Sequence, residues 1–171
     1  MTIRRTLAVA LATVAVAVIA SAGAISSALG DDGLTGDHGL GPHKIVGTWE
    51  ATVNRGPTLP PVKSLHTFTS GGSIIESGSD SMFRSPAYGV WQYVGDRTYA
   101  TTQVFHRFSP TGLYLGTQRI NGNRRLSLDG DSYTAVALAE LRDADGNLIA
   151  SLPPVTVSAT RMQVQRIPNQ P

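Results

Sequence analysis

The chain has 171 residues, of which 14 are lysine or arginine, 12 are acidic, 41% are hydrophobic and none is cysteine. Without cysteine there can be neither disulfide bonds nor a lipid anchor on cysteine, so the fold must be stable through its core and its backbone hydrogen bonds. The small formal net charge of +2 gives no reason to expect a nucleic acid partner.

Residues 1–24 have the pattern of an export signal. Arg4 and Arg5 precede an apolar run from Leu7 to Ala20, and Ala20 to Ala24 contains two small-x-small cleavage patterns. We expect this segment to be cleaved, which predicts a protein that is secreted or on the cell-envelope exterior, with no stable membrane insertion. A retained N-terminal membrane anchor is the alternative. Removal of the two arginines leaves 12 basic and 12 acidic residues, a formally neutral mature chain.

Residues 25–43 are predicted to form a flexible linker. The segment is rich in glycine and aspartate and has almost no apolar pattern. His38 and His43 stand near aspartates here, but a glycine-rich tail does not hold metal ligands at a fixed geometry. We therefore predict no metal site in the linker.

The domain over residues 44–165 begins with a strongly alternating stretch, Ile45 to Val53. Every second residue of it, including Gly47 and Trp49, falls on one largely apolar face, and the residues between them are mostly polar. This alternation predicts a half-buried strand. The glycine removes a side chain next to the tryptophan, which lets another ring or backbone approach closely.

The rest of the domain consists of further predicted strands separated by turn signals. Strands are expected near Lys63–Thr69, Ser73–Ser79, Tyr88–Val94, Arg97–Phe108, Tyr133–Leu141, Leu148–Leu152 and Val155–Val164. Leu113–Leu128 fits either one strand bent at Asn121-Gly122-Asn123 or two short strands. Pro153-Pro154 indicates an edge or a bulge, and residues 166–171 are a tail. We expect an all-β domain, an antiparallel up-and-down β-barrel of about eight strands, with a two-sheet β-sandwich as the alternative.

The triplet Gly47-Thr48-Trp49 on the first strand resembles the Gly-x-Trp signature of the lipocalin-like, or calycin, β-barrels. The resemblance implies that Trp49 closes one end of the barrel and that Arg161, near the last strand, packs across its ring. More narrowly, the chain resembles small secreted bacterial proteins of this class with no assigned activity. That likeness rests also on Trp91 in a central strand, the stretch Phe105–Gly112 and the turn Asp143–Asn147.

The central predicted strands mix aromatic and polar residues, and neither face of Arg97–Phe108 is wholly apolar. Such a mixture is typical of a cavity with a few placed polar groups, and equally of amphipathic strands that face solvent. The favoured hypothesis is a non-catalytic barrel, with no cofactor, that binds a small, mainly apolar molecule in its interior. The predicted ligand contacts are His66, Phe68, Tyr88, Trp91, Gln103, Phe105 and His106.

Two other functions remain open. A barrel enzyme of the cyclase or isomerase type would use His66, His106 or Glu76 as its acid–base group, and requires at least two of these side chains to converge within hydrogen-bond reach. An envelope-associated interaction protein would use the barrel only as a stable body. Two turns have Asp- and Gly-containing sequences similar to those of calcium-binding loops: Asp129–Asp131 and Asp143–Asn147. They lack the remaining acidic ligands and are predicted to be ordinary turns.

Overall fold

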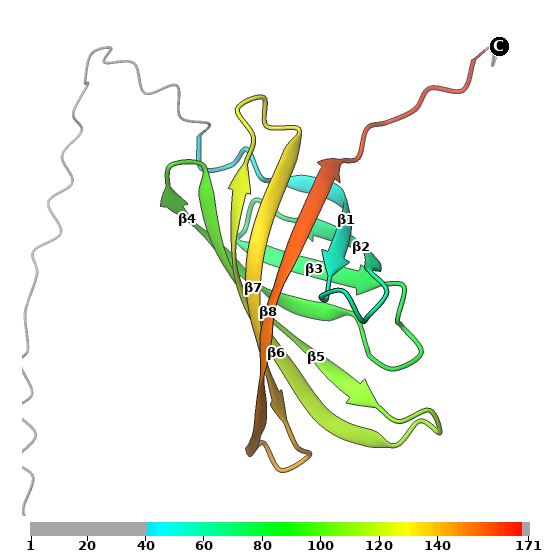
Figure 1. Cartoon of the computed structure of the whole chain (residues 1–171). Helices are drawn as coiled ribbons and strands as arrows, with labels where there is room; N and C mark the ends of the chain where they lie inside the picture. Colours follow the sequence, from blue (N-terminus) through cyan, green and yellow to red (C-terminus); the bar gives the residue numbers. More distant parts are fainter. Residues whose placement is uncertain (1–40, 169–171) are drawn as a thin grey trace, which may run out of the picture. The chain divides into compact units, whose positions relative to one another are not determined.

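The computed structural model describes residues 41–168 of the chain; the predicted export signal and the predicted linker up to Leu40 lie outside the described residues. The described part contains strands and no helix (Figure 1). Its eight strands are β1 (Gly47–Asn54), β2 (Val62–Phe68), β3 (Ser73–Gly78), β4 (Ala87–Gly95), β5 (Thr98–Phe108), β6 (Tyr114–Leu126), β7 (Ser132–Arg142) and β8 (Leu148–Arg161).

The strands form one closed antiparallel barrel in which each strand pairs with its neighbours in the chain, and β8 returns to pair with β1. At the closing seam Trp49 lies opposite Arg161 and Val53 lies opposite Val157. The prediction of an all-β, up-and-down barrel of about eight strands is therefore confirmed, and the sandwich alternative is excluded. Closure gives every strand a partner on both sides over at least part of its length, which leaves little exposed sheet edge.

Strict alternation of inward and outward residues shapes the interior. On β7, Tyr133 and Ala135 are buried, as are Ala137 and Ala139 further along the strand, whereas the residues between them face outward. Because successive side chains point to opposite faces of a strand, one row of β7 forms the inner wall. Its alanines are small, so this part of the wall leaves space inside the barrel.

One end of the barrel is filled by large side chains. The buried cluster there contains Ile45, Trp49, Phe68, Ile74, Tyr99, Leu126 and Tyr133, with Trp91 and Tyr93 packed against it. The Trp49 indole meets the Tyr133 ring edge-on at 5.0 Å between centroids and donates its Nε1 hydrogen to the carbonyl of Ile45 at 2.9 Å. Edge-to-face packing of this kind stabilises aromatic pairs beyond their burial alone.

Arg161 lies over the outer face of this cluster. Its guanidinium carbon is 4.2 Å from the centre of the Trp49 ring. The same group donates hydrogen bonds to the carbonyls of Val46 (2.8 Å), Gly130 (2.9 Å) and Lys44. One side chain therefore ties the segment before β1, the β6–β7 turn and the end of β8 together.

Gly47 makes the approach of Arg161 possible. Its φ angle is +132°, and a Cβ atom placed there would lie 2.9 Å from Arg161 Nη1. A residue with a side chain would be strained in this backbone conformation and would also crowd the guanidinium. The backbone conformation and the closeness of Arg161 thus explain why the Gly-x-Trp triplet has glycine at position 47.

β6 and β8 are each one continuous strand: the structure selects the single-strand alternative for β6, and in β8 it confirms the predicted bulge at the prolines but not the division into two strands. β6 continues through Asn121-Gly122-Asn123 as one strand, paired with β5 and β7 throughout this stretch. β8 runs through Pro153 and Pro154 as one strand, with a register shift opposite Leu138. The two predicted final strands are therefore one, and the prolines lie at a bulge, where the lost backbone hydrogen bond is tolerated.

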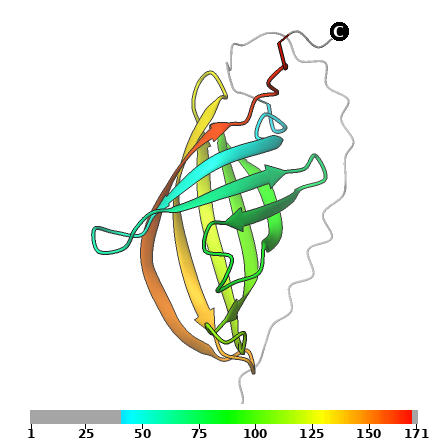
Figure 2. The same ribbon diagram turned by 90° about the vertical axis from the view of Figure 1, so that its right-hand side faces the viewer.

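The barrel has a short side and a long side. The four strands from β5 to β8 have 11 to 14 residues, whereas β1 to β4 have six to nine. The long strands continue beyond the ends of β1, β2 and β3 (Figure 1), and the turned view shows the β1–β2 connection projecting at the side of the barrel (Figure 2). Since β1 pairs with β8 only from Thr156 onward, the first half of β8 has β7 as its one strand neighbour.

Over residues 41–168, no helix is long and apolar enough to cross a membrane.

Candidate functional site

A cavity of about 480 Å³ lies in the barrel beyond the filled end. Small-molecule pockets in proteins typically have volumes of roughly 300–1,000 Å³. The apolar part of its wall comes from β1, β2 and the four strands from β5 to β8: Val53, Val62, Phe105, Ile120, Ala137, Ala139, Leu152 and Val157. The interior is therefore filled at one end and hollow at the other.

The cavity reaches the surface between the β1–β2 connection and β8. Thr58 and Leu59 of the connection line it together with Pro153 and Pro154 of β8, and all four residues are exposed. This rim lies where β8 has no pairing with β1. The gap in strand pairing thus coincides with the mouth of the cavity.

Arg84 provides one polar group of the wall. It comes from the connection between β3 and β4, which is held along β5 by a bridge to Arg107. Its guanidinium donates to both oxygens of Glu76 (2.6 and 3.2 Å) and to Asp80 (2.6 Å), and lies 4.7 Å from the centre of the Phe105 ring. Burial lowers the pKa of Arg84, but the two carboxylates outweigh that effect and raise the pKa overall.

Arg124 provides the second polar group, on the inward row of β6. It is 3% exposed, and it donates to Thr101 Oγ1 and to Gln103 Oε1, the latter at 2.7 Å. Burial lowers the pKa of Arg124, because a charged group is harder to hold away from water. An arginine starts from so high a pKa that it keeps its charge at neutral pH.

His66 lies on the inward row of β2, where the filled end meets the cavity. Its ring nitrogens hydrogen-bond to Ser64 Oγ (2.9 Å) and to the hydroxyl of Tyr133. Burial, together with the charges of Arg124 and Arg84, lowers the pKa of His66 to about 3, so the imidazole is neutral at ordinary pH. Burial also raises the pKa of Tyr133 to about 12.

The seven residues predicted to contact a ligand separate into three groups. His66, Gln103 and Phe105 line the cavity. Phe68 and Trp91 pack in and against the filled end. The remaining two, Tyr88 on β4 and His106 on β5, lie on the outer face of the barrel and are exposed, Tyr88 by 62%. The alternation of each strand places them there, because their inward neighbours Ala87 and Phe105 take the interior positions.

The three candidate acid–base residues do not form one site. His66 and Glu76 lie opposite each other in register and both line the cavity, but His66 bonds to serine and tyrosine and Glu76 bonds to Arg84. His106 is exposed and contacts Tyr114 on the outside. Across residues 41–168 no hydrogen bond joins any two of the three, so His66 and Glu76 share the cavity wall but bond to different partners.

Neither interior arginine, Arg84 or Arg124, was among the site residues predicted from the sequence. Arg124 lies on the same face of β6 as Ile120 and Leu126. A single charged residue on that otherwise inward face was the signal that could have identified it. Arg84 carried no such signal, since it lies in a connection rather than a strand.

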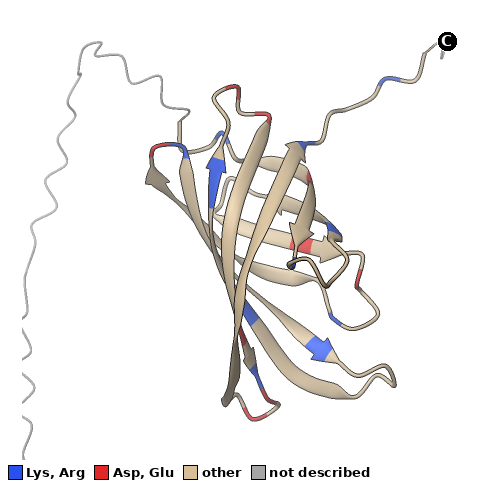
Figure 3. Cartoon of the chain, in the orientation of Figure 1, with Lys and Arg blue, Asp and Glu red and all other residues tan. Residues whose placement is uncertain are grey.

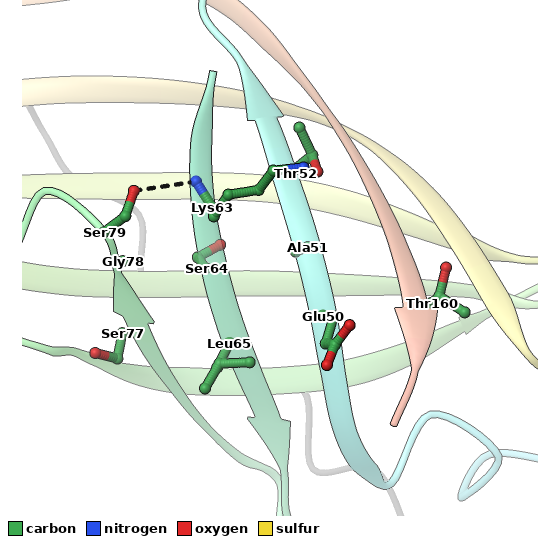
Figure 4. Close-up of a pocket in the computed structure, with 10 residues that line it drawn as sticks. All are labelled: Glu50, Ala51, Thr52, Lys63, Ser64, Leu65, Ser77, Gly78, Ser79 and Thr160. Carbon is green, nitrogen blue, oxygen red and sulfur yellow. Dashed lines mark hydrogen bonds between the residues drawn. The ribbon is translucent and has the colours of Figure 1, made fainter. Parts of the chain in front are cut away.

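Other groupings of polar side chains are less suited to a binding function. Figure 4 shows a hollow on the outside of β1, β2 and β3, with Glu50, Lys63 and Leu65 among the residues that line it. None of the buried polar atoms that lack a partner, within the described residues, belongs to this hollow.

Also within residues 41–168, no three histidine, aspartate or glutamate side chains are grouped so as to hold a metal ion. Basic and acidic residues are interspersed over the barrel (Figure 3).

Fold and site together define a closed eight-stranded antiparallel barrel with an interior cavity, an architecture consistent with a calycin-like barrel. No protein-family model, no curated protein and no solved structure matches the chain.

Proposed function

We propose that this protein is a non-catalytic, exported barrel that binds a small, mainly apolar molecule in its interior. The observation that carries the proposal is the cavity itself, about 480 Å³, lined mainly by apolar side chains and open at one rim. A barrel of eight strands is just wide enough either to fill with side chains or to hold one small ligand. In this barrel large side chains fill one end, and a cavity occupies the rest of the interior.

The shape of the interior supports the binding of a small molecule inside the barrel. Trp49, Tyr99 and Tyr133 fill one end, and each is at most 1% exposed. Beyond Tyr133 the inward row of β7 consists of alanines, of which Ala137 and Ala139 border the cavity. An apolar molecule that enters at the rim would bury its surface against these walls, and burial of apolar surface contributes about 25 cal/mol per Å².

The sequence supports two further parts of the proposal, export and a lipocalin-like relationship. The signal-like segment 1–24 supports export, and the Gly47-Thr48-Trp49 triplet with Arg161 over the indole supports a lipocalin-like relationship. Proteins of that class carry small molecules in the barrel interior. We include both the export and the lipocalin-like relationship in the proposal.

Binding of the neutral apolar fluorophore N-phenyl-1-naphthylamine tests the proposal. The full chain should raise its fluorescence in a saturable manner. Ala139→Trp places a large side chain in the cavity wall and should weaken binding at least about tenfold. Leu138→Trp is the matched control, because Leu138 is the next residue on β7, faces outward and is 55% exposed.

Equal binding by both tryptophan variants and the unchanged protein would place the fluorophore outside the cavity and overturn the proposal. No saturable binding to the unchanged protein would also overturn it, and would favour the envelope-associated interaction protein.

A further inference from the structure

We infer that the molecule held in the cavity carries a carboxylate, and that Arg124 and Gln103 receive this group at the inner end of the cavity. The inference rests on the proposed function and deepens it, since it names the class of ligand: a small apolar acid rather than a neutral apolar molecule.

The first reason is the environment of Arg124. Thr101 and Gln103 accept hydrogen bonds from its two terminal nitrogens, the Phe68 ring lies 5.6 Å from its guanidinium carbon, and the Tyr133 hydroxyl also interacts with it. None of these four groups carries a negative charge at neutral pH, since burial raises the pKa of Tyr133 to about 12. The side chain is only 3% exposed, so water does little to stabilise its charge.

The second reason is that the carboxylates of the wall are already engaged. The charged residues that line the cavity are three arginines, Arg55, Arg84 and Arg124, and two acids, Glu76 and Asp80. Both acids form ion pairs with Arg84, at 2.6 Å each. Glu76 acts on Arg124 only through its charge from a greater distance. With His66 neutral, the lining has a net charge of +1.

The third reason is a pair of unused hydrogen-bond donors. Arg124 Nε and Gln103 Nε2 are both buried, and neither has a partner among the described residues. Because the Gln103 oxygen accepts from Arg124, its amide nitrogen must point elsewhere. Buried donors without acceptors are rare in native proteins and call for an explanation, such as a water, an ion or another group that they bind.

A carboxylate satisfies all three conditions together. It supplies the missing negative charge, and its oxygens accept hydrogen bonds from guanidinium and amide nitrogens. Leaving a buried cation without a counter-charge is strongly unfavourable, so pairing there is worth more than at the surface. The rest of such a molecule would lie along the apolar wall formed by Val62, Ile120 and Ala139, toward the rim.

The test compares ligands that differ only in their head group. Decanoate, decan-1-ol and decyltrimethylammonium share one hydrocarbon chain, and each is titrated at neutral pH against the full-length protein loaded with N-phenyl-1-naphthylamine. We expect decanoate to displace the fluorophore with an affinity at least about tenfold higher than that of decan-1-ol. The cationic ligand should bind most weakly.

The variant Arg124→Met assigns the preference to one side chain. It keeps an unbranched, mainly apolar side chain similar to the aliphatic part of arginine and removes the charge, so decanoate should lose its advantage over decan-1-ol while the fluorophore still binds. Arg125→Met is the matched control, because Arg125 is the next residue on β6 and forms an exposed ion pair with Asp96. This control should keep the full preference for decanoate.

The outcomes separate the two proposals. If the fluorophore does not bind the unchanged protein, the proposed function fails. If the fluorophore binds but decanoate and decan-1-ol compete equally, the cavity is a general apolar site and the carboxylate inference is overturned. The comparison of head groups uses the unchanged protein, so it decides the matter even if Arg124→Met does not fold. A preference that survives in a folded Arg124→Met protein would also overturn the assignment to Arg124.

Discussion

At the scale of single residues, Arg161 has an unusually large share in holding the filled end together. It contacts the Trp49 ring and three backbone carbonyls from two other segments of the chain. Its ion pair with Asp131, at 3.6 Å, contributes little because the carboxylate is 64% exposed. The stabilisation therefore comes from the hydrogen bonds and from the cation–π contact.

Arg161→Ala should lower the free energy of unfolding by about 2–4 kcal/mol, since it removes charged hydrogen bonds and the contact with Trp49. Arg161→Lys should recover only a minor part, because an ammonium group cannot donate to three carbonyls in the same plane. Urea denaturation followed by tryptophan fluorescence measures both. Arg125→Ala, at an exposed ion pair, is the control and should change stability by less than about 1 kcal/mol. A similar small change in Arg161→Ala would contradict this account.

His66 makes stability depend on pH. Its pKa is about 3 in the folded protein, because of burial and of the charges of Arg124 and Arg84; an ordinary histidine in the unfolded chain has a pKa of about 6.5. Below that pH the unfolded chain binds a proton that the folded protein does not. The contribution is therefore fully present above about pH 6.5 and is lost as the pH falls toward 3.

Between about pH 7 and about pH 4.5, this histidine alone should reduce the free energy of unfolding by about 2–3 kcal/mol. Urea denaturation at the two pH values measures the loss. His66→Gln should be less stable than the unchanged protein at neutral pH but should lose much less on acidification. His106→Gln, at an exposed histidine, should behave like the unchanged protein. An equal acid loss in His66→Gln would show that other groups are responsible.

At the scale of the elements, β8 is the strand whose unpaired edge lies beside the mouth of the cavity. Its second half pairs with β1 and β7, whereas its first half, from Leu148 to Val155, pairs with β7 alone. That half would present a free strand edge beside the cavity mouth. Pro153 and Pro154 lack backbone N–H groups, and proline on an edge prevents pairing with a further strand.

The double change Pro153→Val and Pro154→Val should therefore promote self-association, because it restores two donors and adds residues that favour strands. Size-exclusion chromatography with light scattering over a range of protein concentrations measures this. The unchanged protein and Pro57→Ala, a change in the exposed β1–β2 connection, serve as references. If the double variant has the same mass as both references at every concentration, the prolines do not protect the edge.

The sequence was sufficient for most of the elements and for only part of the site. Period-two alternation identified the strand at Trp49 and the two faces of β5, because alternation is a local property. The continuity of β6 was left open and the division of β8 into two strands was wrong, since pairing with neighbouring strands overrides Gly122 and the two prolines. The inward positions of Arg84 and Arg124 depend on packing between distant segments, which no local pattern records.

At the scale of the whole molecule, the barrel divides into a filled half and a hollow half. The filled half provides the stable core, with Trp49, Tyr99 and Tyr133 fully buried. The hollow half is lined by His66, Gln103 and Arg124 next to the filled half, and it opens at the rim. A molecule that binds only the folded protein would stabilise it by mass action, by about 2.7 kcal/mol at a hundredfold excess over its dissociation constant.

The central claim is that an apolar molecule lies inside the barrel, and intermolecular nuclear Overhauser effects test it most directly. Protein with labelled methyl groups is saturated with unlabelled decan-1-ol, a probe that does not depend on the carboxylate inference. We expect contacts from the ligand to Val62, Ile120 and Leu152, which line the cavity, and none to Val136 and Leu138, which face outward on β7. Contacts confined to the outward methyl groups, or no contacts at saturation, would contradict the account.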